Sequence, residues 1–350
     1  MPPTIRNLQE TLYPLLWLPG RIYSRLMRAR GLYYRLSAVK SPEKLCVSVG
    51  NIAWGGRGKS PFCAYLAGQY LKKGLTPAIL TRGYGAKPPA CPHPVRLDDP
   101  VSACGDEPLD LMSRLADVQI IIDPDRKRAA EWARSRINPD LFILDDGFQH
   151  MRMPRHVDIV LLSAYDLGKG WNRVIPSGEW REGQNALRRA DLFAVHLNSD
   201  PDRTRAAAAK RLHGFGKPIV YFQTKADGLR KVADNSRVTG LNSPYLALAG
   251  ISNPGRFIHS AQTFLQKPAG GTLFFPDHHI FTTRDWEKIN RTARDKGCKH
   301  ILCTSKDAVK LKNMADDKLL CLDIGIQLSD TDQARLWKIL DSGRNRLKLR

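Results

Sequence analysis

The 350-residue sequence lacks any apolar run of the roughly 18 residues that a membrane-spanning helix needs. The longest run near the start, Leu12 to Leu18, is short and contains Pro14. It has no cationic leader before it and no small-residue cleavage site after it. We therefore expect neither a transmembrane helix nor a secretory signal.

Paired cysteines are also missing. The seven cysteines include no CxxC pair, and several lie inside apolar runs, where a thiol packs as a small hydrophobic group. This spacing argues against a zinc site and against a disulfide framework. The simpler interpretation is a protein of a reducing compartment, the cytoplasm.

Acidic residues are few compared with basic ones. The 55 Lys and Arg residues outnumber the 34 Asp and Glu residues, which gives a formal net charge of +21. Such a charge favours anionic partners: nucleic acid, acidic phospholipid or a phosphorylated substrate. The sequence contains none of the recognition motifs of nucleic-acid-binding modules, so we expect no nucleic-acid partner. Nothing in it indicates an obligate protein partner.

The first 44 residues are aromatic and basic, and they differ from the rest of the chain. After a break at Pro19-Gly20, apolar residues recur at helical spacing with arginines on the neighbouring face: Ile22, Leu26, Ala29, Tyr33 and Leu36. One interpretation is an amphipathic helix lying on an anionic membrane. The other is a helix docked on its own domain with a solvated basic face. We prefer the membrane, because the preceding apolar run would otherwise be an exposed patch.

From residue 45 onward, short apolar runs alternate with helical segments. This alternation predicts an α/β fold with a parallel sheet flanked by helices on both faces. We expect a nucleotide-binding core over 45–200 and a second, smaller α/β lobe over 201–342. The segment 1–44 would precede them as the membrane-associating part, and 343–350 would be a frayed basic tail.

A glycine-rich loop, Gly55-Gly-Arg-Gly-Lys-Ser60, stands between a strand-like run and a helical segment. Phosphate-binding loops need glycines so that backbone N–H groups point at the phosphates, a lysine for the β/γ oxygens, and a hydroxyl for Mg²⁺. Ala53 replaces the usual first glycine of such a loop. The alternative interpretation is a glycine-rich turn that happens to precede Lys59 and Ser60. The order of strand, glycines, Lys-Ser and helix favours a P-loop NTPase-like core that binds ATP and Mg²⁺, through Ala53, Trp54, Gly55, Gly56, Arg57, Gly58, Lys59 and Ser60.

Carboxylates follow a second strand-like run. Leu141–Leu144 leads into Asp145-Asp146, the pattern of a strand end aimed at the metal beside a phosphate-binding loop. The alternative is a simple Asp-Gly turn at the end of a strand, but the glycine-rich loop upstream favours the metal-directed carboxylates. A Pro/Gly-rich loop further on places Arg181 next to Glu182, which could form a phosphate clamp with a metal-directed carboxylate.

Two further sites could supply acid–base chemistry. Asp106 precedes a helical segment, where it could cap the helix or could orient and deprotonate an alcohol. His278 and His279 follow a later strand beside Asp277, with no third spaced ligand for zinc. A catalytic histidine and a histidine satisfied by a backbone carbonyl are both consistent with this pattern.

Together these motifs resemble the tetraacyldisaccharide 4′-kinase family of lipid A synthesis. The likeness spans residues 45 to 310 and lies in Ser48–Asn51, Gly55–Pro61, Thr81–Gly85, Gly105–Pro108, Leu144–His150, Phe275–His279 and Thr304–Ala308. The resemblance implies Mg-ATP as donor and the 4′-hydroxyl of a lipid A disaccharide 1-phosphate as acceptor, giving lipid IVA. It also implies a peripheral or monotopic enzyme on the anionic cytoplasmic face of a bacterial inner membrane.

The resemblance also implies roles for individual residues. Lys59 and Ser60 would hold phosphates and Mg²⁺, with Asp145, Asp146 and Glu182 serving the metal. Asp106 would be the catalytic base, paired with His278, with His279 as the alternative partner, and Arg181 would line the transfer site. Alternatives are a nucleic-acid-dependent P-loop NTPase, a kinase of another hydroxyl, or a membrane scaffold with a decayed nucleotide site.

Overall fold

The computed structural model describes residues 9, 11–36, 43–55, 57–115, 117–197 and 199–348. The strands are β1 (Leu45–Asn51), β2 (Pro77–Thr81), β3 (His93–Pro94), β4 (Gln119–Ile122), β5 (Leu141–Asp145), β6 (Val157–Ser163), β7 (Leu192–His196), β8 (Ile219–Lys231), β9 (Arg237–Val238), β10 (Tyr245–Ala249), β11 (Gly271–Phe274), β12 (His300–Thr304) and β13 (Leu319–Leu328).

The α-helices are α2 (Tyr13–Leu36), α3 (Lys59–Lys72), α4 (Val101–Cys104), α5 (Asp106–Arg114), α6 (Arg126–Arg136), α7 (Ala164–Leu167), α8 (Pro201–Leu212), α9 (Pro254–Leu265), α10 (Thr283–Asp295), α11 (Ser305–Leu311) and α12 (Asp330–Lys348). Short 3₁₀ turns add Gln184–Arg189, His213–Phe215 and Lys312–Met314.

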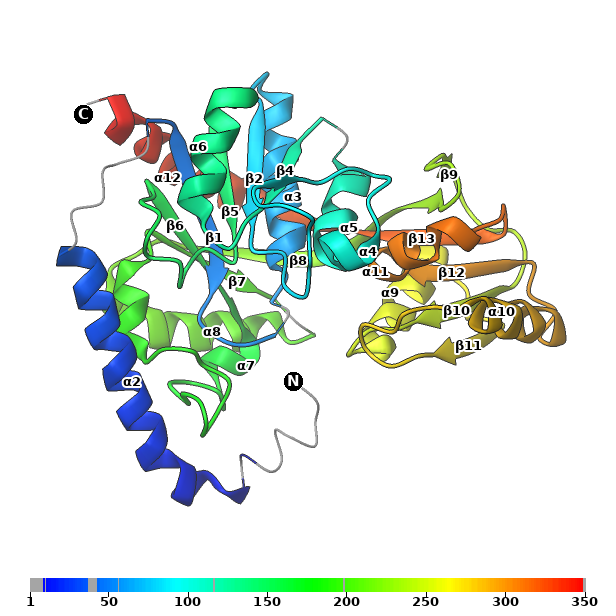
Figure 1. Cartoon of the computed structure of the whole chain (residues 1–350). Helices are drawn as coiled ribbons and strands as arrows, with labels where there is room; N and C mark the ends of the chain where they lie inside the picture. The colour runs from blue at the N-terminus through cyan, green and yellow to red at the C-terminus, as the bar shows by residue number, and fades with distance from the viewer. Residues whose placement is uncertain are drawn as a thin grey trace.

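One sheet runs through two lobes, a larger and a smaller one (Figure 1). Its strand order is β11-β10-β12-β13-β8-β7-β6-β1-β5-β2-β4-β3, and β9 pairs with β8. Pairing is parallel except for β3 with β4, β9 with β8, and β8 with β13. The predicted α/β class, a mostly parallel sheet flanked by helices, is confirmed.

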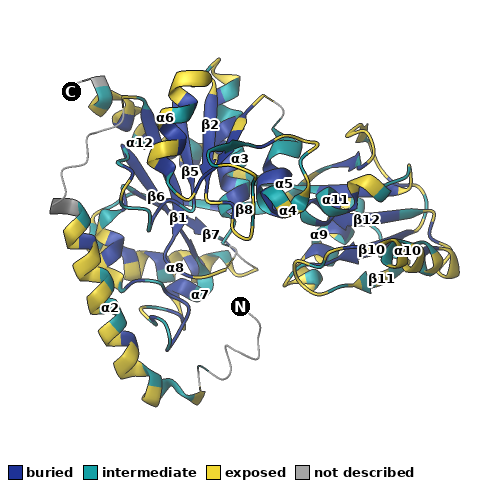
Figure 2. Ribbon diagram, in the orientation of Figure 1, coloured by how far each residue is buried: buried dark blue, intermediate teal, exposed yellow. Residues whose placement is uncertain are grey.

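Helices cover both faces of the sheet in the larger lobe. The apolar sides of α3, α5 and α12 join one face of β1, β5 and β6 in a single cluster. On the opposite face lie α6 and α8. The central strands are therefore buried on both sides (Figure 2), and every residue of β1 is buried. Burial on both faces explains why these strands are continuous apolar runs in the sequence.

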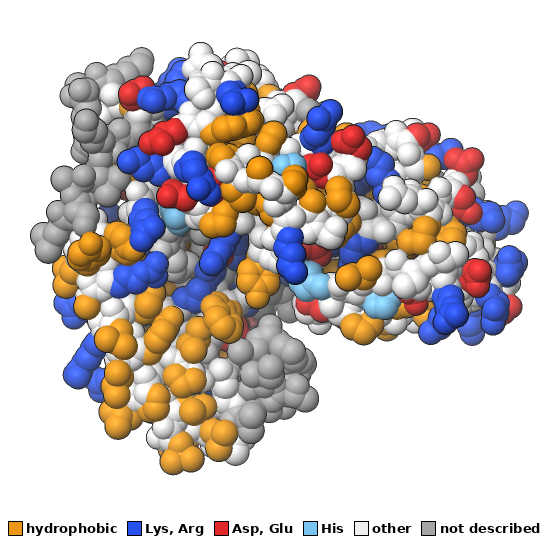
Figure 3. All heavy atoms as spheres, viewed as in Figure 1, with side chains coloured by type: hydrophobic (Ala, Val, Ile, Leu, Met, Phe, Trp, Pro, Cys, Tyr) orange, Lys and Arg blue, Asp and Glu red, His pale blue; other side chains and the backbone are white. Residues whose placement is uncertain are grey.

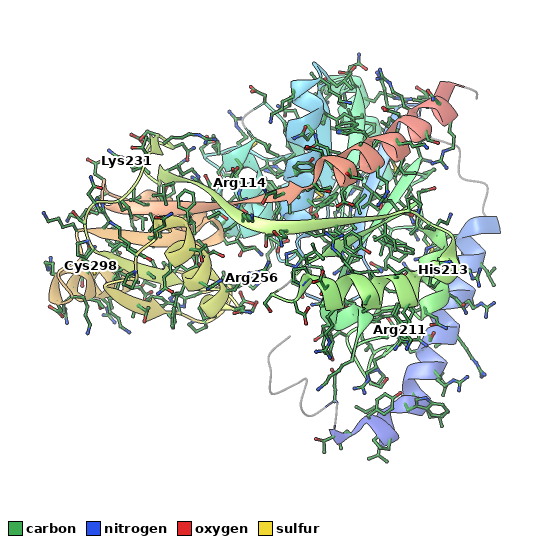
Figure 4. All side chains as sticks on the ribbon, turned by 180° about the vertical axis from the view of Figure 1, so that it is seen from behind. Arg114, Arg211, His213, Lys231, Arg256 and Cys298 are labelled. Carbon is green, nitrogen blue, oxygen red and sulfur yellow. The ribbon has the colours of Figure 1, made fainter. Side chains whose placement is uncertain are left out.

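Two long strands join the lobes. The start of β8 pairs with β7 in the larger lobe, and its remainder pairs antiparallel with β13 in the smaller lobe. Figure 4 shows β8 crossing behind the molecule from one lobe to the other. The register of this pair shifts between Asp323 and Ile324, which places a bulge near the crossing. Among the described strands, the antiparallel pair β8–β13 is the connection that makes the sheet continuous between the lobes.

Side chains also bridge the lobes beside the two long strands. Arg114 at the end of α5 donates to the carbonyl of Ile324 at 2.9 Å and contacts Ser305. Arg256 in α9 reaches His196 at the end of β7, with 3.0 Å between the nitrogens. Figure 4 labels Arg114 and Arg256, which lie at this junction. The lobes are thus joined by polar contacts as well as by the sheet.

The division of the chain differs from the predicted boundaries at residues 201 and 342. Helix α8 and the start of β8 belong to the larger lobe, and α12 returns to it. Leu336 and Leu340 in α12 are buried against the larger lobe's strands. The helix also continues to residue 348 instead of fraying at 343. Gly343 explains this, since a Cβ there would lie 2.4 Å from Val157 Cγ2, so the helix is tightly packed.

The N-terminal helix differs from the prediction of a break at Pro19-Gly20, because α2 passes straight through both residues. Gly20 lies against the core, where an added Cβ would meet Ser177 Oγ at 2.9 Å. Close packing of this kind can outweigh the local preference of Pro-Gly to end a helix. The docked face of α2 therefore combines close approach at Gly20 with apolar packing, since Tyr23 lies against a buried cluster of the larger lobe. Within the described residues, no helix has the length and apolar character to cross a bilayer.

Removing apolar volume from α12 should destabilise the larger lobe. We expect Leu336→Ala to lower the free energy of unfolding by about 2–5 kcal/mol, because it leaves a cavity in the main core. Lys338→Ala, on the exposed side of the same helix, should cause no measurable change. Urea denaturation followed by circular dichroism measures both. Equal stability of the two variants would contradict this packing.

Candidate active site

The loop after β1 bends so that its backbone faces the start of α3. Gly55 and Gly58 have φ of 95° and 84°, values that favour glycine, and Gly58 directly precedes Lys59 in the helix. Ser60, the second residue of α3, is buried. Gly56 lies outside the described residues. A glycine turn at a helix N-terminus favours a bound phosphate, because unpaired N–H groups and the helix dipole both face it.

Asp146 is held by two basic residues at this loop. Arg181 donates to both of its carboxylate oxygens, at 2.9 and 3.0 Å, and Lys59 Nζ lies 3.6 Å from Oδ1. Arg181 also donates to the carbonyl of Ala53 at 3.1 Å and to Asn51 Oδ1 at 2.6 Å. Burial works to raise the pKa of Asp146, but Lys59 and Arg181 hold it below its usual value. The carboxylate is therefore ionised and fixed beside the phosphate loop.

Asp145 lies in a different environment, although it is the next residue. Burial, with the nearby carboxylates of Glu107 and Asp146, raises the pKa of Asp145 to about 6. Its neighbours are Thr81 Oγ1 at 3.2 Å and Cys63 Sγ at 3.7 Å. Within the described residues, no basic side chain forms an ion pair with it. A buried carboxylate with no ion-pair partner is a position that a divalent metal ion would stabilise.

The donor set at this point fits Mg²⁺. Ser60 supplies a hydroxyl, and Asp145 and Asp146 supply carboxylates, all hard oxygen ligands of the kind that Mg²⁺ prefers. Asp145 ends β5, which pairs with β1, so both groups lie at the carboxyl edge of adjacent parallel strands. Ligand sites of open α/β sheets lie at this edge. Lys59 and Cys63, which lie on either side of Ser60 in α3, contact Asp146 and Asp145, so three of the four residues predicted for the metal belong to this region.

Asp106 and His278 meet across the two lobes. Asp106 begins α5 in the larger lobe, and its Oδ2 lies 2.9 Å from Nδ1 of His278 in the smaller lobe. Burial works to raise the pKa of Asp106, but His278 and then Lys306 lower it below its usual value. The hydrogen bond to Asp106 raises the pKa of His278 in turn. His279 instead contacts Asp285, at 3.1 Å, so His278 is the histidine beside Asp106.

Comparison with known proteins places this geometry in a family. The model of the family described as tetraacyldisaccharide-1-P 4′-kinase matches residues 12–343. The chain belongs to this family. A tetraacyldisaccharide 4′-kinase of Oleidesulfovibrio alaskensis is 38% identical over 312 residues, which cover 87% of this chain and 85% of that one. Another from Nitratidesulfovibrio vulgaris is 37% identical over 326 residues, covering 91% and 90%.

A solved structure of the family shares the fold. The crystal structure of LpxK from Aquifex aeolicus in complex with ATP matches with a TM-score of 0.73 and 25% sequence identity. The match covers 95% of this chain and 99% of that one. The resemblance inferred from the motifs is therefore confirmed along nearly the whole length of the tetraacyldisaccharide-1-P 4′-kinase fold.

The side chain of Arg57 pairs with buried carboxylates, whereas the prediction that Arg57 binds nucleotide concerns the backbone of the loop and stays a prediction. Its guanidinium pairs with Asp166 at 2.9 Å and with Glu179 at 2.5 Å, and both carboxylates are buried. Trp180 Nε1 donates to the same Asp166 at 3.3 Å. The phosphate loop is therefore fastened to the 164–182 region by a buried ion-pair network. The role of Arg57 is to position the loop, a role that no local sequence pattern indicates.

The start of the loop is held by backbone contacts instead of side chains. Ala53 is fully buried and forms a β-bridge with Trp180, and the N–H of Trp54 donates to the carbonyl of Glu179 at 2.8 Å. The Trp54 side chain is more than half exposed. The bridge needs a small buried residue at position 53, which explains why alanine fits where the usual motif has glycine.

Glu182 is not brought into the carboxylate group beside Ser60. Both of its oxygens accept hydrogen bonds from Arg189, at 2.7 and 2.8 Å, and the side chain is buried. A metal-binding role for Glu182 stays a prediction, and it would require this ion pair to open. Arg181, the neighbouring residue, lies at the phosphate loop as predicted.

Two basic residues near the carboxylates were missed from the sequence. Arg126 is 3% exposed, its Nε has no hydrogen-bond partner, and it interacts electrostatically with Asp145 and Asp146. Burial and then Arg126 lower the pKa of His150 to about 4, and its Nε2 also lacks a partner. The unpaired guanidinium N–H of Arg126 suits an anionic ligand. The position of Arg126 could have indicated it, because the residue closely follows the carboxyl end of β4, at the sheet edge where sites of this fold lie.

Removing the Arg57 side chain should destabilise the larger lobe strongly. We expect Arg57→Ala to cost about 3–5 kcal/mol in the free energy of unfolding, because it leaves two buried carboxylates without their cation. Arg134 pairs with Glu43 on the surface, so Arg134→Ala is a matched control with little expected effect. Chemical denaturation measures both. A loss for Arg57→Ala no greater than for the control would show that this network does not hold the loop.

Proposed function

We propose that this chain is a kinase that transfers the γ-phosphoryl group of ATP to the 4′-hydroxyl of a tetraacyldisaccharide 1-phosphate, a lipid A precursor. One observation carries the proposal beyond family membership. The Asp106–His278 pair lies at the start of α5, whose next residue, Glu107, is close enough to raise the pKa of Asp145. An acid–base pair and a phosphate-and-metal site therefore share one centre, as phosphorylation of an alcohol requires.

The side chains divide the chemistry between them. Lys59 and the loop N–H groups bind the donor's phosphates, and Arg181 adds positive charge beside them. Ser60, Asp145 and Asp146 would hold Mg²⁺, which would supply further positive charge at the phosphate oxygens. Asp106 takes the proton as the acceptor's O–H bond breaks, while the acceptor oxygen bonds to phosphorus and ADP leaves. His278 orients the Asp106 carboxylate and keeps its pKa low.

The rate enhancement comes mostly from the positioning of the reacting groups. An alcohol and a phosphoryl group held in line react much faster than in solution, because little further entropy is lost. The contacts of Arg114 and Lys306 across the lobes hold α5 beside the smaller lobe. These contacts keep Asp106 at the centre and limit the access of water to it.

We also propose that α2 places the enzyme on the anionic cytoplasmic face of a bacterial inner membrane. The outward side of the helix carries apolar side chains that are more than half exposed, among them Leu18, Ile22 and Leu26. Figure 3 shows apolar side chains gathered over the region of α2. The docked alternative accounts for the inner side of the helix and for its exposed arginines, but not for the large apolar side chains exposed beside them. These apolar side chains support contact with lipid.

A cavity beside α2 supports the same proposal. It measures about 640 Å³, and its described lining includes Arg21, Arg25 and Arg28 with Trp17 and no acidic side chain. Cations and aromatic rings next to an apolar helix face suit the headgroup region of an anionic bilayer. The segment 1–44 therefore acts as the membrane-associating part, followed by the nucleotide-binding and second lobes.

The alternative of a nucleic-acid-dependent NTPase has less support. Family membership favours the lipid acceptor over nucleic acid. It also favours the lipid acceptor over another small hydroxyl compound. The fixed geometry of Lys59, Asp146 and Asp106 also disfavours a scaffold with a decayed nucleotide site. No feature of the described surface favours nucleic acid beyond the positive net charge, which an anionic membrane explains as well.

The decisive assay follows labelled γ-phosphate from ATP. With detergent-dispersed tetraacyldisaccharide 1-phosphate, we expect label in the lipid fraction rather than as free phosphate. Lys59→Ala should lower transfer by at least about 10²-fold, because it removes charge stabilisation at the phosphates. Lys72→Ala, at the far end of the same helix, is the matched control. Label released only as phosphate, or stimulated by nucleic acid, would overturn the proposal.

The Asp106–His278 pair predicts a shift in pH dependence. His278 is the main group that lowers the pKa of Asp106, so His278→Gln should let that pKa rise. The acidic limb of kcat/KM reports the free enzyme's base and should therefore move to higher pH. His279→Gln should leave the limb in place, because His279 contacts Asp285 instead. An unmoved limb in His278→Gln would remove Asp106 from the role of base.

The membrane proposal predicts a loss of vesicle binding. Replacing Leu18, Ile22 and Leu26 together with Gln should weaken binding to anionic vesicles by more than about tenfold, because each buried side chain contributes about 1.5–3 kcal/mol at most. Phe264→Gln, an exposed apolar residue of α9, should bind as the parent does. Vesicle flotation measures the bound fraction. Unchanged binding of the triple variant would exclude α2 as the membrane contact.

A further inference from the structure

Three side chains outside the active site converge in the segment before α5. Asp99 Oδ2 lies 2.9 Å from His93 Nε2 and accepts a hydrogen bond from Cys104 Sγ at 3.2 Å. It also accepts the N–H of Arg96 at 2.8 Å. His93 belongs to β3 and Cys104 ends α4, so a short stretch of chain brings all three together. The proposed kinase mechanism uses none of them.

These three side chains offer the ligand atoms of a thiophilic metal site. One nitrogen, one sulfur and one carboxylate oxygen lie within 4.8 Å of one another. Zn²⁺ bonds to these atom types at about 2.0–2.3 Å in tetrahedral sites, with a water in the fourth position where the protein supplies three ligands. Only small side-chain movements would therefore bring the atoms to bonding distance.

Burial separates this group from a chance surface cluster. Cys104 is fully buried, and the side chains of His93 and Asp99 are only 14% and 16% exposed. Within the described residues, it is the only group of three or more His, Cys, Asp and Glu side chains with this convergence. A nitrogen and sulfur donor set also discriminates against Mg²⁺, which prefers oxygen ligands.

We propose that His93, Asp99 and Cys104 form a binding site for Zn²⁺ or a similar thiophilic divalent cation, separate from the Mg²⁺ position. Binding removes the thiol proton of Cys104 and leaves the Nε2 lone pair of His93 on the metal, with the imidazole proton on Nδ1. Cys104 lies two residues before Asp106, with only Gly105 between them. An ion bound to the Cys104 sulfur therefore restrains the backbone that carries the candidate base.

Proton release makes the binding pH-dependent. Burial and the hydrogen bond to Asp99 raise the pKa of Cys104 to about 12, so the metal-free protein holds a thiol at neutral pH. Because the metal binds the thiolate, its apparent affinity should rise by up to about tenfold per pH unit. The three-ligand geometry, and not this titration, is the basis of the site.

The test is a titration of the metal-free, full-length protein with Co²⁺, which reports thiolate ligation by a sulfur-to-cobalt charge-transfer absorption. We expect one equivalent to produce this band together with the visible bands of tetrahedral Co²⁺. Zn²⁺ should abolish both bands at stoichiometric concentration, and millimolar Mg²⁺ should not. Absence of the charge-transfer band, or its loss in Mg²⁺, would overturn the proposal.

Matched variants assign the ligands. Cys104→Ser should lose the charge-transfer band, whereas Cys91→Ser, a nearby half-buried cysteine outside the group, should keep it. His93→Gln retains the thiol and should weaken Co²⁺ binding by at least about tenfold. Circular dichroism tests whether each variant is folded. If Cys104→Ser does not fold, His93→Gln still tests the site. A band that survives in Cys104→Ser, or unchanged affinity in His93→Gln, would refute the assignment.

Discussion

The contact between Asp106 and His278 is the interaction on which the candidate site depends, because it joins groups from two lobes. Asp106 begins α5 in the larger lobe, and His278 follows β11 in the smaller one. Any change in the angle between the lobes would change this 2.9 Å distance. The sheet limits such change through β8 and β13, the long strands that cross between the lobes. The sheet, the largest structural element of the fold, thus positions Asp106 beside His278.

Buried charge organises the other half of the site. Arg57 lies in the phosphate loop and Arg181 contacts it, and each binds carboxylates from segments distant in the sequence. Arg57 fastens the loop to Asp166 and Glu179, whereas Arg181 joins Asp146 to the carbonyl of Ala53. A loop rich in glycine gains rigidity from such contacts, which its own backbone does not supply. Its phosphate-binding geometry is therefore prepared before the nucleotide arrives.

Much of this was predictable from the sequence, for a physical reason. Strands buried on both faces are short apolar runs, so the run Leu141–Leu144 was recognised and ends one residue before β5 does. Phosphate-loop chemistry needs particular residues in a fixed local order, so Lys59 and Ser60 were also predictable. Asp145 and Asp146 lie nearby because parallel strands end at one edge. Sequence patterns were sufficient to predict a feature wherever that feature depends on residues close together in the sequence.

The features that were not predictable depend on distant contacts. Nothing near Arg57 in the sequence indicates Asp166 or Glu179 as its partners, so the ion-pair network of its side chain was not predicted. The helix α2 continues through Pro19 because the core packs against Gly20, and α12 extends past 343 because Gly343 fits against Val157. The choice between His278 and His279 also required the fold, since adjacent residues face different neighbours.

The most direct test of the central claim is a double-mutant cycle on kcat/KM for phosphoryl transfer, with Asp106→Asn, His278→Gln and both together. If His278 acts through Asp106, the double variant should be about as slow as Asp106→Asn alone, because the histidine then has no carboxylate to orient. A double variant whose loss equals the product of the two single losses would contradict the account, since the two residues would then act independently.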